Sequence, residues 1–304
     1  MEALLAPLQY AILPVFGFAI LGFVLGRVGE FSRQAAEGAN QFMVGIAVPA
    51  LQFRLISGVN FDAVEWDMIA AYLAVEFSIY GFGFLVMRYG FRVGPRESVL
   101  LAMTAAFPNH VYVVLPIAER LYGPESIDPV ASVIVFDIVL MFGGTIMIME
   151  AIKGEQGPLA VLKDIATNRL IVVIALGFAW NFSGLALHDG FSFFLDMATA
   201  SATPVALFSL GVILSGQSLQ SIGGPVWAVV GFKNFLMPLL AVIMLGTFLA
   251  PSPAWEAPSL LMYGAPSGVL AFVLGLKYGV KVESIAKAVI ISTALSILTA
   301  ATLA

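Results

Sequence analysis

The chain has 304 residues, of which 60% are hydrophobic and only 11% charged, with a formal net charge of −5. Soluble domains carry roughly 45–50% apolar and about 25% charged residues, so this composition excludes a soluble domain and predicts an all-α membrane protein. Cysteine is absent, which excludes disulfides and cysteine-ligated zinc or iron–sulfur sites. Only His110 and His188 are histidines, so we expect no metal site, and we expect no nucleic-acid partner. No basic leader precedes the first apolar segment, which we therefore expect to be retained.

Ten apolar stretches are long enough to cross a bilayer, which takes about 17–25 helical residues. They lie at residues 8–25, 36–55, 68–87, 99–121, 131–149, 170–187, 192–214, 227–248, 258–276 and 285–303. The loops that follow the odd-numbered stretches hold eleven of the fourteen basic residues, namely Arg27, Arg33, Arg88, Arg92, Arg96, Lys153, Lys163, Arg169, Lys277, Lys281 and Lys287. The positive-inside rule places these loops in the cytoplasm, so we expect ten spans in the inner (plasma) membrane with both termini outside.

Two of the stretches carry a proline and then a helix-capping residue type at their centre. The fourth reads Pro108, Asn109, His110, and the ninth reads Pro266, Ser267. Proline ends a helix, and Asn and Ser side chains cap new starts, so second half-helices are predicted to begin at Asn109 and Ser267. Irregular backbone at membrane depth is tolerated where it lines a wet cavity, and paired interruptions indicate a secondary transporter's binding site. Two ordinary proline kinks are the alternative.

An internal repeat relates the two halves of the chain. Residues recur 155 positions apart, since Leu21, Gly22 and Phe23 recur as Leu176, Gly177 and Phe178, and Pro49 and Phe53 recur as Pro204 and Phe208. Five spans per copy is an odd number, so the second copy is inverted and the broken helices 4 and 9 are predicted to cross near the midplane. The chain then divides into a first repeat (1–152), an amphipathic linker helix at the cytoplasmic surface (153–168) and a second repeat (169–304). The positive N-terminal ends of the second half-helices would favour a small anion at the crossing.

Three ionisable residues lie deep in apolar stretches, namely Glu76, Asp137 and Lys233. For the two carboxylates, a proton or sodium coupling site is weighed against a structural ion pair or hydrogen bond, for which Lys233 is one candidate partner. Likewise, His110 is either a pH-sensitive ligand or a neutral imidazole bonded beside the break. Gln52 lies in the second stretch, where a lone amide is either packing or a ligand.

Several motifs of the chain resemble the auxin efflux carrier family, which comprises the plant PIN-type carriers and bacterial relatives that include malonate transporters. The most specific pieces are Val48-Pro49-Ala50-Leu51-Gln52-Phe53, Pro108-Asn109 with Pro116, Lys233 with Pro238, and Pro266-Ser267-Gly268 through Phe272-Val273 to Tyr278 and Val280. The resemblance implies ten spans in inverted repeats, a scaffold of spans 1, 2, 6 and 7, and a moving transport part of spans 3–5 and 8–10. It also implies elevator-like alternating access and a homodimer formed through the scaffold.

By position, the resemblance implies that Asn109 is the crossover asparagine that meets the substrate carboxylate, and that Gln52 lines the pocket. Asp137 stands where the plant carriers have a glutamine and Glu76 where they have a lysine. These departures argue against auxin itself and in favour of ion coupling.

We therefore expect a secondary active transporter of a small organic anion, a carboxylate that is auxin-like or a dicarboxylate. Its expected binding residues are Asn109, Pro108, His110, Pro266, Ser267 and Gln52, with Glu76 or Asp137 carrying a coupling proton beside Lys233. The alternatives are a sodium-coupled symporter of the bile-acid type and an uncoupled carrier. An enzyme is not expected, because an intramembrane aspartyl protease needs two facing aspartates and only Asp137 is deep. No cofactor is expected beyond a coupling H⁺ or Na⁺.

Overall fold

The computed structural model describes residues 6–154, 157–217, 220–249 and 251–303, and their secondary structure is helical apart from one isolated bridge. Residues 1–5, which precede the first apolar segment, and residues 155–156 of the predicted linker lie outside this description. The α-helices are α2 (Leu13–Val28), α3 (Arg33–Phe42), α4 (Val48–Gly58), α5 (Trp66–Leu85), α6 (Pro95–Ala106), α7 (Leu115–Tyr122), α8 (Ile127–Phe136), α9 (Gly143–Lys153), α10 (Pro158–Ala166), α11 (Arg169–Ser183), α12 (Asp189–Ala200), α13 (Ala202–Ser215), α14 (Gly224–Gly231), α15 (Met237–Thr247), α16 (Pro253–Gly264), α17 (Leu270–Lys277) and α18 (Glu283–Leu303). Short 3-10 or π-helical segments join or precede them at η1 (Leu8–Ile12), η2 (Met43–Ala47), η3 (Phe61–Ala63), η4 (Val86–Gly90), η5 (His110–Val114), η6 (Pro124–Ser126), η7 (Asp137–Phe142) and η8 (Phe232–Leu236).

All ten apolar stretches fall on helices, two of which are interrupted. Within the described residues, six helices are long and apolar enough to cross a membrane, namely Leu8–Val28, Trp66–Gly90, Pro124–Lys153, Asp189–Ser215, Gly224–Thr247 and Glu283–Thr302. The chain is therefore an all-helical, multi-pass membrane protein. The further crossings and the inverted repeat stay predictions.

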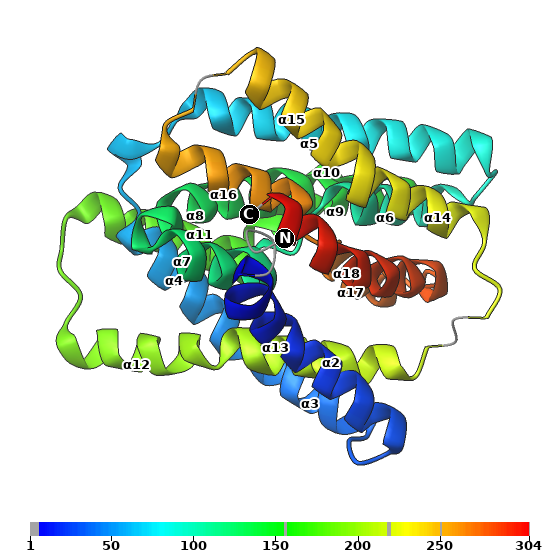
Figure 1. Cartoon of the computed structure of the whole chain (residues 1–304), viewed down its shortest axis with the longest axis horizontal. Coiled ribbons are helices and arrows are strands. Elements are labelled where there is room, and N and C mark those ends of the chain that lie inside the picture. Colours follow the sequence, from blue (N-terminus) through cyan, green and yellow to red (C-terminus); the bar gives the residue numbers. More distant parts are fainter. Residues whose placement is uncertain (1–5, 155–156, 218–219, 250, 304) are drawn as a thin grey trace.

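The helix ends gather at two opposite sides of the molecule. In Figure 1 the connections from α2 to α3, α5 to α6 and α17 to α18 lie to the right, whereas those from α4 to α5 and α11 to α12 lie to the left. The connections on the right are loops in which the sequence concentrates arginine and lysine. The linker contains α10, which exposes Leu159 and Leu162.

Glycines set the closest helix contacts of the fold. A Cβ atom at Gly22 of α2 would lie 2.1 Å from the carbonyl oxygen of Phe208 in α13, and one at Gly211 of α13 would lie 2.1 Å from the carbonyl oxygen of Ala19. Gly177 of α11 similarly faces Ile56 of α4, whose Cβ would be 2.9 Å away. Small residues let membrane helices approach closely where packing supplies the association energy. Glycine thus allows two closely packed pairs of helices, α2 with α13 and α11 with α4.

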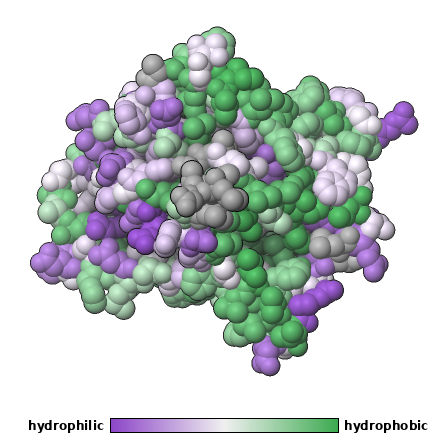
Figure 2. All heavy atoms as spheres, viewed as in Figure 1, coloured by the Kyte–Doolittle hydropathy of each residue, from purple (hydrophilic) through white to green (hydrophobic). Residues whose placement is uncertain are grey.

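Much of the outer surface is apolar, as lipid contact requires. Figure 2 shows hydrophobic side chains along the upper edge over α15 and at the bottom over α2 and α3, whereas hydrophilic ones gather to the left and at the right and lower tips. Among the exposed apolar side chains are Phe18, Ile20 and Val24 of α2 and Leu239 and Val242 of α15. A chain this apolar on its outside cannot be stable in water without a lipid or detergent layer.

Candidate functional site

Two helices break in the middle of the molecule, and the two breaks are bonded to each other. One break separates α6 from η5 and the other separates α16 from α17. The N–H of Asn109 donates to the carbonyl of Pro266 at 2.9 Å, and the N–H of Gly268 donates to the carbonyl of Phe107 at 2.7 Å. Backbone groups freed by each proline are thereby satisfied by the other break, which solves the problem of irregular backbone inside a membrane.

Gly268 is required for this close approach. A Cβ atom there would lie 2.5 Å from Cδ1 of Phe107 and 3.0 Å from the carbonyl oxygen of Pro108. A larger residue would therefore push the two segments apart and lengthen the hydrogen bonds between them.

The predicted caps are wrong in detail. Asn109 precedes η5, but its side chain does not cap the helix, and α17 begins at Leu270 rather than at Ser267. The physical reason is tertiary, because Ser267 pairs with Pro108 in an isolated antiparallel bridge and donates its N–H to Oγ of Ser292 at 3.0 Å. The residues between Ser267 and Leu270 then return the chain to a helical conformation. The Asn109 side chain is left free for another partner.

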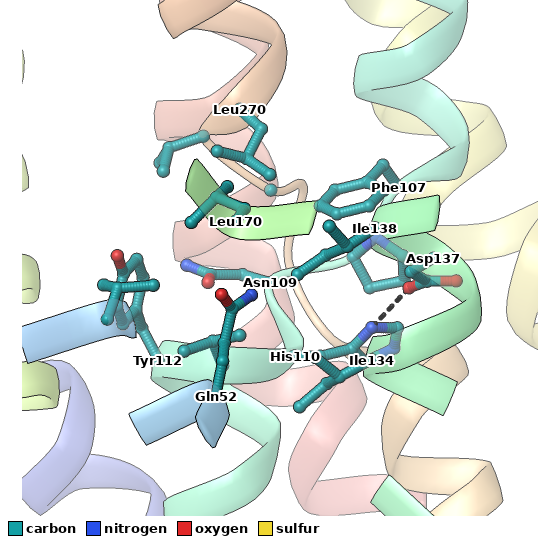
Figure 3. A pocket seen from close by; sticks show the side chains of 15 residues that line it. Gln52, Phe107, Asn109, His110, Tyr112, Ile134, Asp137, Ile138, Leu170 and Leu270 are labelled. Atoms are coloured by element: carbon teal, nitrogen blue, oxygen red, sulfur yellow. Dashed lines mark ion pairs between the residues drawn. The ribbon is translucent and has the colours of Figure 1, made fainter. Parts of the chain in front are cut away.

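A cavity of about 50 Å³ lies beside the joined breaks. A site needs about 10–15 Å³ for each water, so this one has room for a few waters or a small ligand. Its polar lining consists of Gln52, Asn109, His110, Tyr112 and Asp137, and its apolar lining of Val48, Phe107, Pro108, Val111, Ile134, Ile138, Leu170, Gly268, Val269 and Leu270. Figure 3 shows the amides of Gln52 and Asn109 directed toward the same space. Of the predicted binding residues, Pro266 and Ser267 are the two that lie outside this lining, although both bond the break that forms its wall.

Gln52 is a polar side chain of the cavity lining for which the described part of the protein supplies no hydrogen-bond partner. It is 1% exposed, and neither its amide nitrogen nor its amide oxygen has a hydrogen-bond partner among the residues that the structure describes. A buried polar group left unbonded costs about 1–3 kcal/mol. A ligand in the cavity would remove that cost.

The second half of the first broken helix begins beside the cavity. The N–H of Val113 bonds to the carbonyl of Asn109, so the N–H groups of His110, Val111 and Tyr112 come before the first bond of this helical turn. Such leading N–H groups carry partial positive charge and bind anions. All three residues line the cavity.

A buried ionisable network adjoins the cavity. Nδ1 of His110 lies 2.6 Å from Oδ2 of Asp137, the contact that is dashed in Figure 3, and Nε2 of His110 lies 3.1 Å from the Tyr72 hydroxyl. Behind Asp137 is Glu76, which is 0% exposed and close enough to share a hydrogen bond with it when one of the two is protonated. The carboxyl groups, the imidazole and the hydroxyl therefore form one connected set that reaches the cavity at His110 and Asp137.

Among the described residues Lys233 does not pair directly with a carboxylate, so of the two alternatives for Glu76 and Asp137 the structural ion pair with Lys233 is not formed. Its ammonium donates to the carbonyl of Tyr263 at 3.2 Å and to the sulfur of Met237 at 3.1 Å, although its charge still acts on Glu76 and Asp137. Tyr263 is in the last turn of α16, where carbonyls lose their helical partners and carry partial negative charge. The break in the helix thus supplies the partner that the sequence did not reveal.

Further polar groups hold the breaks in place without reaching the cavity. The amide nitrogen of Asn234 donates to the carbonyl of Ser292 and to Oγ of Ser296, while Ser292 receives the N–H of Ser267. Tyr72, the partner of His110, was missed from the sequence. The available signal was its position one helical turn before Glu76 on a largely buried face.

Comparison with known proteins places these features in a wider set. The family model described as "Membrane transport protein" matches residues 8–163 and 159–304. A protein named "Putative malonate transporter" from Rhizobium meliloti is 27% identical over 97% of this chain and 94% of its own. "Auxin efflux carrier component 5" of Arabidopsis thaliana is 19% identical over 94% of this chain and 93% of its own. "Lysosomal cholesterol signaling protein" of Mus musculus is 24% identical over 94% of this chain but only 36% of its own length.

Proposed function

Since the chain belongs to the membrane transport protein family, the family of the auxin efflux carriers, we propose that it is a secondary active transporter of a small organic anion. The substrate is a carboxylate that binds in the cavity beside the joined breaks. The side chains of Asn109 and Gln52 form hydrogen bonds with it, and the N–H groups at the start of η5 stabilise its negative charge.

The unbonded amide of Gln52 is the observation on which this proposal depends most. A wholly structural glutamine at 1% exposure would be expected to bond its neighbours, because buried polar groups almost always do. Gln52 and the residues that begin η5 line the same cavity. Amide and backbone donors facing one space suit a carboxylate, which accepts from several donors at once.

The lining of the cavity favours a carboxylate, because the side-chain amides of Gln52 and Asn109 and the first residues of η5 all border it. Malonate is the first compound to test, because the relative from Rhizobium meliloti carries that substrate in its name.

Coupling to a proton is the second part of the proposal. The proton resides on the set formed by His110, Asp137 and Glu76, whose buried carboxyl groups are close enough to hold it between them. His110 and Asp137 also line the cavity, so loading a proton and loading an anion affect one another electrostatically. Sodium coupling and uncoupled transport are the outcomes to be separated from this by experiment.

The proposed transport cycle uses ten spans in two inverted repeats. The glycine contacts support this arrangement, because Gly22 and Gly177 occupy equivalent positions and meet Phe208 and Phe53, which are equivalent in turn. In this proposal the scaffold of spans 1, 2, 6 and 7 forms a homodimer, and spans 3–5 and 8–10 move past it in an elevator-like step. Both termini face outward from the inner membrane.

Uptake into proteoliposomes tests the proposal. Radiolabelled malonate and a panel of short mono- and dicarboxylates are offered with a pH gradient, with a sodium gradient and with neither. We expect at least one carboxylate to accumulate with the pH gradient, and Asn109→Ala to weaken its apparent affinity at least about tenfold, because a hydrogen bond to a charged group is worth about 1.5–3 kcal/mol. Asn60→Ala, in an exposed loop, serves as the control. Undiminished affinity in Asn109→Ala would remove this residue from the site.

A further inference from the structure

Cavities follow one another along the seam between α4 and the second half of the first broken helix. The inner one is the cavity described above, into which Val48, Gln52, Val111 and Tyr112 face. Two larger cavities, of about 430 and 270 Å³, also lie along this seam, and the larger one extends to Gly58 at the end of α4. We call these two together the vestibule; both are lined by Leu51, Leu115, Glu119 and Thr199.

Leu51 and Leu115 occupy the step between the inner cavity and the vestibule. On α4, Val48 and Gln52 line the inner cavity, whereas Leu51, which lies between them in the sequence, lines the vestibule. On the facing segment, Val111 and Tyr112 line the inner cavity and Leu115 the vestibule. Adjacent positions of α4, and positions about one turn apart on the facing segment, thus border different cavities, so the two cavities are separated by about a single layer of side chains. Although they border open space, Leu51 is only 9% exposed and Leu115 only 7%.

We propose that Leu51 and Leu115 form a hydrophobic gate between the substrate cavity and a vestibule that opens to the outside. This inference rests on the proposed function and adds the route that the anion takes. A narrow apolar layer excludes water and therefore blocks hydrated ions while it is closed. The two leucines belong to different parts of the proposed mechanism, since one lies on a scaffold span and the other on a transport span, so relative movement of these parts would open the gate.

The vestibule does not itself select anions. Its charged lining is Arg54, Glu119 and Asp128, and Nε of Arg54 is 3.1 Å from Oδ1 of Asp196. One basic side chain that is already paired, together with two acidic ones, gives no attraction for negative charge. Selection is therefore assigned to the cavity, and the gate only controls access.

Thiol labelling tests the gate, because the chain contains no cysteine and single reporters can be placed at will. Val48→Cys reports on the inner cavity and Thr199→Cys on the vestibule. An impermeant, cationic methanethiosulfonate reagent is added outside cells that express each variant. We expect Thr199→Cys to react readily in every background, and Val48→Cys to react at least about tenfold faster when Leu51→Ala or Leu115→Ala widens the apolar layer.

Leu55→Ala is the matched control, since Leu55 lies one turn beyond Leu51 on α4, is partly exposed and lines only one of the two vestibule cavities, whereas Leu51 and Leu115 line both. It should leave the rate at Val48→Cys unchanged. Equal rates in the Leu51, Leu115 and Leu55 variants would overturn the gate, and failure of Thr199→Cys to react from outside would overturn the position of the vestibule. Two replacements guard against one that does not fold, and Thr199→Cys labelling reports folding in each.

Protection by malonate and the short carboxylates separates this inference from the proposed function. If the leucine variants accelerate labelling but no carboxylate slows it, the gate stands and the substrate class is wrong. If carboxylates slow labelling at Val48→Cys and the leucine variants do not accelerate it, the substrate class stands and the gate is wrong.

Discussion

At position 52 the chain buries an amide to which no backbone or side-chain group in the described part of the chain forms a hydrogen bond. The same position lines the cavity beside the broken helices, so its two possible roles, in packing or in binding, make opposite predictions for stability. A packing residue stabilises the empty protein. A ligand-binding residue that is unbonded when empty lowers its stability.

We expect Gln52→Leu to keep or raise the melting temperature of the purified protein without substrate, since it removes an unbonded amide that costs about 1–3 kcal/mol. The same change should weaken carboxylate binding at least about tenfold, because it removes a hydrogen bond to a charged group. Thermal unfolding in detergent and a binding isotherm measure the two effects. Gln34→Leu, on the exposed surface of α3, should alter neither. A clear fall in melting temperature for Gln52→Leu would indicate packing instead.

Asp137→Asn and Glu76→Gln should each reduce or abolish the stimulation of uptake by a pH gradient, because either change removes a carboxyl group from the set that holds the proton. Asp137→Asn should have the larger effect, since Asp137 contacts both His110 and Glu76. Proteoliposomes that carry each variant are compared with and without a pH step. Asp62→Asn, an exposed change far from the cavity, is the control. Full stimulation in both variants would show that these carboxyl groups carry no coupling proton.

At the residue scale, the sequence was sufficient to identify polar and charged side chains that lie within apolar stretches. Asn109, Glu76, Asp137 and Lys233 were identifiable because polar groups in apolar stretches are costly. Their partners were not, since Lys233 bonds a backbone carbonyl that only the break in another helix makes available. The pattern of side chains in the sequence does not predict which backbone carbonyl will be free to accept such a bond.

At the scale of the element, helices α2 and α13 pack through glycine so closely that a larger residue would displace backbone atoms. Gly22 meets the Phe208 backbone and Gly211 meets the Ala19 backbone. Backbone atoms cannot turn aside as a flexible side chain can. The fold therefore depends on these positions more than on other glycines of the same helices.

Gly22→Ala should lower the stability by about 2–3 kcal/mol, because the added methyl group overpacks a contact against backbone. Gly17→Ala is the matched control, since it lies in the same helix with nothing within 4 Å of the added atom. Thermal unfolding of the two variants in one detergent makes the comparison. Equal stability of the two would mean that α2 and α13 do not pack as described.

Both breaks were predictable at the scale of the element, whereas the residue at which α17 resumes was not. Proline at positions 108 and 266 fixes where a helix must end. Where the next half begins depends on Ser292 of α18, which takes the N–H of Ser267, and on the bridge between Ser267 and Pro108. These partners are distant in sequence, so local capping preference gave a start three residues too early.

Across the whole molecule, the requirements of a bilayer made the positions of the helices predictable from the sequence. Each crossing needs a fixed length of apolar residues, and basic residues accumulate in the loops on one side, so all ten apolar stretches fall on observed helices. Dimerisation and elevator movement cannot be predicted from such patterns, because an apolar helix surface is equally suited to contact with lipid and to contact with another protein surface. They remain proposals that follow from the family.

The orientation can be tested on the whole molecule with single cysteines. An impermeant thiol reagent added to intact cells should modify Leu185→Cys, in a loop predicted outside, and should modify Glu30→Cys only after the membrane is opened. Both positions are exposed, so differences in burial do not explain the contrast. The reverse pattern would invert the assignment of the two faces.

The central claim is that two broken helices, joined at their breaks, form a carboxylate site. The most direct measurement is an experimental structure of the protein with its tightest-binding carboxylate. The account predicts one carboxylate group in the cavity, within about 3 Å of the side-chain amides of Asn109 and Gln52 and of a leading N–H of η5. A carboxylate bound elsewhere, or breaks no longer bonded between Asn109 and Pro266, would contradict it.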